Sequence, residues 1–223
     1  YLRSLESARL AGEPLLAAHA LSNLGDLYLK AGHFGEALQI FQLGSIPAQQ
    51  AAAPGMLARL AFDEARAHAG LGNVDEVQRA LRHAGEHYDR AQQAPDEWVN
   101  TTVLLDRSEL PAGRASAYSR LAGHDSCFAE NAVTEVTEAL TLRDPSRARA
   151  MLWGRITLAA NQYRCGETDL ANADTELVLT SVGQVSSRRT TRDLAALGSQ
   201  IRRRTTDSTA LDLAHRIHTE VAA

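Results

Sequence analysis

Apolar side chains recur at helical spacing between residues 21 and 44. Leu21, Leu24 and Tyr28 lie three and four positions apart, which places them on one stripe of an α-helix. Gly32 follows this stripe, and glycine readily takes the left-handed backbone conformation that ends a helix. The pattern therefore predicts a helix that ends at Gly32 and turns Leu21, Leu24 and Tyr28 towards the interior of a helical stack.

Small residues complete the pattern. Gly25 and Ala37 are small enough to let two paired helices cross closely, and Phe41 follows Ala37 by one helical turn. Together with Leu21 and Tyr28, these residues have the spacing of a tetratricopeptide repeat, with Leu21 where Trp is usual. We therefore predict an all-α fold, namely a right-handed superhelical stack of tetratricopeptide-like helical hairpins.

Similar patterns continue along the chain. Gly72 stands 40 residues after Gly32, and Asp144-Pro145 is typical of a helix start. In the third unit, Phe128 occupies a place where a small residue is expected. We predict a single tetratricopeptide-like solenoid over residues 1–223, with repeats at about 17–50, 57–94, 109–142 and 145–180 and C-terminal capping helices at about 187–222.

The capping helices have signals of their own. Leu194, Leu197 and Ile201 lie at helical spacing, so we expect them to face inward. Asp207, in the polar stretch before the last helix, is a residue type that caps helix N-termini. These helices are expected to close the end of the stack.

Composition narrows the classes of function. The chain is 44% hydrophobic and only 5% aromatic, which favours packed helices over sheets. Its formal net charge of −4 gives no general attraction to nucleic acid. Cys127 and Cys165 are too few for a disulfide framework, so we expect a cytoplasmic protein. No apolar run approaches the roughly 20 residues that span a bilayer, so we expect no membrane contact. Because the chain starts at Tyr1 rather than Met, we expect it to begin partway through a longer polypeptide.

Four short blocks of sequence are similar to those of a known family. They cover residues 18–24, 65–72, 105–110 and 186–190. In this order they resemble blocks of the tetratricopeptide-repeat regions of actinobacterial transcriptional regulators, which carry a lambda-repressor-like helix-turn-helix domain before the repeats. The resemblance implies a ligand- or peptide-sensing and dimerisation module, a homodimer, and contact with DNA only through an upstream domain that this chain lacks.

A stripe of polar and aromatic residues lies opposite the predicted packing positions. On the inner helices of a solenoid, such residues line the concave side. Arginines and aromatics together can bind a carboxylate or stack on a flat ligand; alternatively, neighbouring helices or a dimer mate cover these side chains. The predicted ligand groove consists of His19, Ser22, Asp26, Lys30, Arg59, Phe62, Arg66, Trp153, Ile156, Tyr163 and Arg164.

One stretch matches an enzyme motif. His83, Glu86 and His87 follow the H-x-x-E-H spacing of inverted zinc peptidases, in which two histidines hold zinc and the glutamate acts as general base. Gly85 weakens a helix there, however, and a polar outer helix explains the same residues. We expect no catalytic site, metal or cofactor.

Two further clusters of histidine or arginine residues are best explained as solvent-exposed helix faces. His215 and His218 lie three residues apart on the final helix. The second cluster is basic. A basic cluster can bind phosphate, but here acidic neighbours reduce the local positive charge and no aromatic residue is interleaved. It consists of Arg188, Arg189, Arg192, Arg202, Arg203 and Arg204.

Three functional hypotheses follow. The first is a regulatory module that binds a peptide or small-molecule effector in its concave groove and controls absent DNA-binding heads. The second is a protein–protein interaction scaffold without a switching role. The third is a zinc-dependent hydrolase that uses the string from His83 to His87.

Overall fold

The computed structural model describes residues 1–93, 106–183 and 188–222. These residues form helices joined by turns, and the described part of the chain contains no strand, which confirms the all-α fold class. Contacts between helices divide the chain into two units, Tyr1–Leu121 and Ala122–Ala223. Each unit is described by itself.

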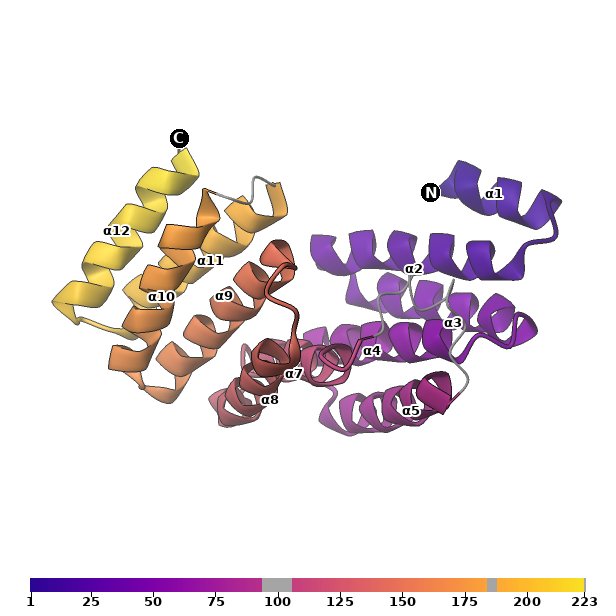
Figure 1. Ribbon diagram of the computed structural model, residues 1–223, viewed down its shortest axis with the longest axis horizontal. Helices are drawn as coiled ribbons and strands as arrows, with labels where there is room; N and C mark the ends of the chain where they lie inside the picture. The colour runs from indigo at the N-terminus through magenta and orange to yellow at the C-terminus, as the bar shows by residue number, and fades with distance from the viewer. Residues whose placement is uncertain (94–105, 184–187, 223) are drawn as a thin grey trace. The chain divides into compact units, whose positions relative to one another are not determined.

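The first unit packs its helices mainly in chain order. The helix α2 packs on α3, α3 on α4, and α4 on both α5 and α7, while α1 packs on α2 (Figure 1). The bounds of these helices are α1 (Leu2–Leu10), α2 (Pro14–Ala31), α3 (Phe34–Gln50), α4 (Pro54–Gly70), α5 (Val74–Gln93) and α7 (Glu109–Leu121).

The ends of α2 follow from its sequence. Pro14 begins the helix, where its missing N–H removes no helical hydrogen bond. Gly32 ends it with φ +85°, and its N–H donates to the carbonyl of Leu29 at 3.2 Å. The helix end predicted at Gly32 is therefore confirmed, because glycine has no Cβ to oppose this conformation.

The inward stripe predicted for α2 is wrong in part. Tyr28 is 39% exposed, while Leu21 and Leu24 are only partly buried. The interior position at this end of the helix belongs to Leu29, which is 1% exposed. Tyr28 instead lies beside the turn that follows α2, with its ring edge-on to the ring of His33. At the C-terminal end of α2, the buried position is therefore Leu29 rather than Tyr28.

Glycines mark the places where helices cross most closely. A Cβ on Gly25 of α2 would lie 2.6 Å from Cδ1 of Phe41 on α3, and one on Gly113 of α7 would lie 2.7 Å from Cε1 of Phe62 on α4. Ala37 of α3 is fully buried. The prediction that Gly25 allows a close crossing is therefore confirmed.

The second unit also consists of helices joined by turns in its described residues. The helix α9 packs on α8, α10 and α11, and α12 packs on α10 and α11 (Figure 1). The bounds are η1 (Ser126–Phe128), α8 (Ala129–Leu142), α9 (Ala148–Cys165), α10 (Thr168–Val182), α11 (Arg188–Arg204) and α12 (Ser208–Ala222).

The start of α9 differs from the prediction. The helix begins at Ala148 rather than at Pro145, because the carboxylate of Asp144 accepts a hydrogen bond from the N–H of Ser146 at 2.8 Å and forms a turn instead. The helix ends before Gly166, which has φ +80°.

The last two helices, α11 and α12, agree with the sequence prediction. Leu194, Leu197 and Ile201 are at most 2% exposed, as the spacing predicts. Asp207 precedes α12, and its carboxylate accepts a hydrogen bond from the N–H of Ala210 at 2.8 Å. Asp207 is therefore the predicted N-terminal cap.

Several hydrogen bonds join side chains that are 40 residues apart. In the first unit, Arg66 donates to Asp26; in the second, Arg216 donates to Glu176. This offset equals the separation of Gly32 and Gly72, both with positive φ. The helices α7 and α8, predicted to form the third hairpin, belong to different units. A continuous superhelical stack therefore stays a prediction.

Candidate ligand-binding site

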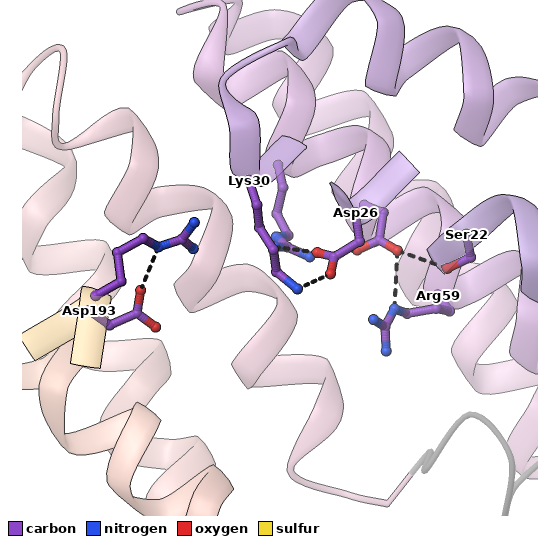
Figure 2. A network of polar contacts seen from close by, with 8 residues as sticks. Ser22, Asp26, Lys30, Arg59 and Asp193 are labelled. Carbon is purple, nitrogen blue, oxygen red and sulfur yellow. Dashed lines mark hydrogen bonds and ion pairs between the residues drawn. The ribbon is translucent and has the colours of Figure 1, made fainter. Parts of the chain in front are cut away.

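A buried carboxylate organises the polar residues of the first unit. Asp63 lies in the middle of α4, and its side chain is 1% exposed. It accepts hydrogen bonds from Nε of Arg59 at 3.1 Å, Nη1 of Arg66 at 2.7 Å and Oγ of Ser22 at 3.3 Å. Figure 2 shows Ser22 and Arg59 bonded to one carboxylate. Asp63 thus fixes two arginines of its own helix and one residue of α2.

A second carboxylate extends this network along α2. Asp26 accepts a hydrogen bond from Nη2 of Arg66 at 3.3 Å and forms an ion pair with Lys30 (Figure 2). Arg66 therefore bridges Asp63 and Asp26, which connects α4 to α2. We call the set Asp26, Lys30, Arg59, Asp63 and Arg66 the α2–α4 cluster.

The cations of the α2–α4 cluster differ in their access to solvent. The side chain of Arg59 is 40% exposed and that of Lys30 is 25% exposed, whereas that of Arg66 is 13% exposed. Asp63, which is 1% exposed, thus holds Arg59 from the buried side, and Asp26, which is 16% exposed, is more buried than its partner Lys30. Arg59 therefore has the most exposed side chain of the three cations.

Neighbouring charges and burial shift the pKa values of Arg59 and His19. The nearby carboxylate of Asp63 raises the pKa of Arg59, with smaller contributions from Asp26 and Glu109. Burial lowers the pKa of His19, and the positive charge of Arg59 acts in the same direction. His19 is therefore neutral at pH 7, while Arg59 keeps its charge.

The structure brings together most of the residues predicted from the first two repeats. His19, Ser22, Asp26 and Lys30 come from α2, and Arg59 and Arg66 come from α4. Sequence reasoning missed Asp63. A signal for it exists, because Asp63 lies four residues after Arg59 and three before Arg66, on the same helical face.

Two of the residues predicted for the groove in this unit are interior residues. Phe62 is 5% exposed, and its ring occupies the space left by Gly113 on α7. Ser22 is 3% exposed and donates its hydroxyl hydrogen to Asp63. Phe62 therefore packs α4 against α7, and Ser22 supports the carboxylate that holds the arginines.

The residues predicted from the fourth repeat lie in the second unit and are largely buried. Ile156 is 6% and Tyr163 is 4% exposed, and the hydroxyl of Tyr163 donates to Oδ1 of Asn172 on α10 at 2.7 Å. Trp153 and Arg164 are partly exposed. Ile156 and Tyr163 thus pack within the core of this unit rather than line an open surface.

The zinc-peptidase string lies on α5, where His83 and Glu86 are exposed and His87 is partly buried. Glu86 forms an ion pair with Arg90 at 4.0 Å. Burial lowers the pKa of His87, so its ring is neutral at pH 7. Within residues 1–93, 106–183 and 188–222, no group of three or more His, Cys, Asp or Glu side chains can hold a metal ion.

The remaining predicted clusters are on the second unit. His215 and His218 are exposed on α12. Arg192 forms an ion pair with Asp193 at 3.8 Å, and Arg202 donates to the carbonyl of Ala214 at 3.2 Å. The side chains of residues 188 and 189, and the parts of the resembling blocks at 105 and 186–187, lie outside the described residues.

Comparison of the chain with protein-family models and with curated proteins finds no match. Among the helices that the structure describes, none combines the length and the apolar character needed to cross a bilayer.

Proposed function

We propose that this chain is a tetratricopeptide-like binding module whose first unit takes a peptide or small-molecule effector through a carboxylate group. The observation that carries the proposal is Asp63, which is almost fully buried and holds the guanidinium groups of Arg59 and Arg66. Arginine presents parallel N–H groups that match the two oxygens of a carboxylate. A ligand carboxylate would bind the exposed part of Arg59.

The ion pairs of Asp63 serve recognition rather than net stability. A buried ion pair contributes little net stability, because removing charges from water costs about as much as their attraction returns. Asp63 therefore holds Arg59 in one orientation before a ligand arrives. Such preorganisation strengthens binding because less side-chain entropy is lost on association.

The regulatory part of the proposal rests on the resemblance to actinobacterial transcriptional regulators. In that setting, the effector would bind one conformation of a cytoplasmic homodimer more tightly and so change the spacing of upstream DNA-binding domains. A helix-turn-helix encoded directly upstream of Tyr1, together with a dimer mass from light scattering, would support this role. An unrelated upstream sequence would contradict it.

The binding experiment uses a random pentapeptide library with free carboxyl termini and the same library with amidated termini. Immobilised protein captures peptides, and calorimetry then measures the Kd of those recovered. We expect capture to require the free carboxylate and Arg59→Gln to weaken binding at least tenfold.

The matched control is Arg79→Gln on α5, whose arginine is 58% exposed and pairs with Glu76 at 3.0 Å. This variant removes the same charge from the protein, so we expect less than a twofold change in Kd. Equal capture of the amidated library, no capture at all, or unchanged affinity in Arg59→Gln would contradict the proposed site.

The alternative is a protein–protein interaction scaffold without a switching role. Exposed apolar side chains on α3 favour it, since Leu43 is 55% and Ile46 is 54% exposed. Substituting both by Ser would then abolish partner binding, whereas Arg59→Gln would leave it unchanged.

A further inference from the structure

An arginine in the second unit is held by a neutral residue instead of a carboxylate. Nη1 of Arg164, on α9, donates to Oδ1 of Asn161 at 2.9 Å. Asn161 is fully buried, and its own amide donates to the carbonyl of Thr157 at 2.7 Å. Within the described residues, Arg164 makes no ion pair with an acidic side chain. Its position is therefore fixed while its charge is not neutralised.

The register of the helices places a second arginine beside it. Gln200 of α11 donates to the backbone carbonyl of Ala160 on α9, an offset of 40 residues. Arg164 and Arg204 each follow these residues by four positions, which is one helical turn. Since α9 and α11 pack together, the same offset aligns Arg204 with Arg164. In agreement, burial and then the charge of Arg204 lower the pKa of Arg164.

In the first unit, two residues at the same offset of 40 positions carry opposite charges. There, Arg66 donates to Asp26, so an arginine lies next to a carboxylate 40 residues earlier. In the second unit an arginine, Arg204, is aligned with another arginine, Arg164. Two like charges at this position repel each other, and an anion between them would remove the repulsion.

We propose that Arg164 and Arg204 together bind a phosphate group. Phosphate fits this pair because each guanidinium presents paired N–H donors and a phosphate offers several acceptor oxygens with close to two negative charges. Asn161 is a positioning residue, since it orients Arg164 from the buried side. This site lies wholly within the second unit and does not depend on the carboxylate site of the first.

The test is an NMR titration of the full chain with sodium phosphate, with sodium chloride added to hold the ionic strength constant. The Nε–Hε signals of the arginines report binding directly. We expect saturable shifts of the Arg164 and Arg204 signals, at least tenfold weaker phosphate binding in Arg204→Gln, and less than a twofold change in Arg203→Gln. Arg203 is the matched control because it is an exposed neighbour on the same helix.

Sodium acetate and phenyl phosphate complete the titration. Acetate should bind at least tenfold more weakly than phosphate, because it carries a single charge. Phenyl phosphate identifies the source of the group: tighter binding of the ester supports an organic phosphate as the ligand, and tighter binding of the free ion supports inorganic phosphate.

A stability measurement checks the alignment independently. Arg204→Glu gives Arg164 an acidic neighbour at the offset that Arg66 and Asp26 use, so it should abolish phosphate binding and raise the Tm. Arg203→Glu makes the same change of charge in the last turn of α11 without facing Arg164, so its Tm should be lower than that of Arg204→Glu. The proposal is overturned if phosphate shifts do not saturate, if acetate binds as tightly, if Arg203→Gln weakens binding as much as Arg204→Gln, or if Arg204→Glu is no more stable than Arg203→Glu.

Discussion

Replacing Gly25 by Ala tests the close crossing of α2 and α3. A Cβ at this position would lie 2.6 Å from Cδ1 of Phe41 and closer still to Cε1. Carbon atoms in proteins pack at about 3.5–4.0 Å, so the new methyl group and the ring overlap. Phe41 is fully buried, which leaves its ring no solvent to move into.

The magnitude follows from two opposing effects. Overpacking a core costs about 1–3 kcal/mol, and the severe overlap places Gly25→Ala at the upper end, about 3 kcal/mol. Ala is a better helix former than Gly by about 1 kcal/mol, which offsets part of this cost. We therefore expect Gly25→Ala to lower the free energy of unfolding by about 2 kcal/mol.

Urea unfolding followed by circular dichroism measures this change. The control is Gly35→Ala on α3, where a Cβ would meet no atom within 4 Å, so stability should rise by up to about 1 kcal/mol. Phe41→Leu should lower the free energy of unfolding by less in the Gly25→Ala variant than in the wild type. A Gly25→Ala variant as stable as the wild type would refute the close crossing.

Three further predictions use the same unfolding assay. Asp63→Asn should lower the free energy of unfolding by about 3 kcal/mol, because it leaves Arg66, only 13% exposed, with one carboxylate partner. Burial, followed by the charge of Asp63, raises the pKa of Glu64, so the native state loses stability as the pH rises through that raised value. Glu64→Gln should therefore be more stable than the wild type at pH 7, and the difference should disappear below pH 4.5, the ordinary pKa of the group; a constant difference at all pH values would contradict this cause. Arg216→Gln should leave the free energy of unfolding nearly unchanged despite hydrogen bonds of 2.7 and 2.9 Å to Glu176, because both side chains are exposed; a clear loss of stability would contradict this view.

Local signals in the sequence were sufficient for some of the helix ends and inward faces, but not for all. Gly32 and Gly166 end their helices because a positive φ suits glycine, and this preference needs no tertiary information. Leu194 and Ile201 face inward because their spacing matches a helical turn. Asp144 shows the limit of such signals, since its carboxylate favours either a helix start or a turn, and here it forms the turn.

The candidate site was only partly predictable for a different reason. Helical spacing groups Asp26 and Lys30 on one face, but it does not show which polar residues are buried. Asp63 is buried because Ser22 and Arg66 satisfy it, and these contacts depend on how α2 and α4 pack. Phe62 is likewise buried because Gly113, far away in sequence, leaves room for its ring.

The most direct measurement of the central claim is the NMR signal of the Arg59 Nε–Hε group during a titration with free-carboxyl pentapeptides. If Asp63 holds Arg59 ready for a carboxylate, this signal should shift with the same Kd as the bound peptide, while the signal of Arg79 on α5 stays in place. Peptide binding that moves the Arg79 signal and leaves the Arg59 signal unchanged would contradict the claim.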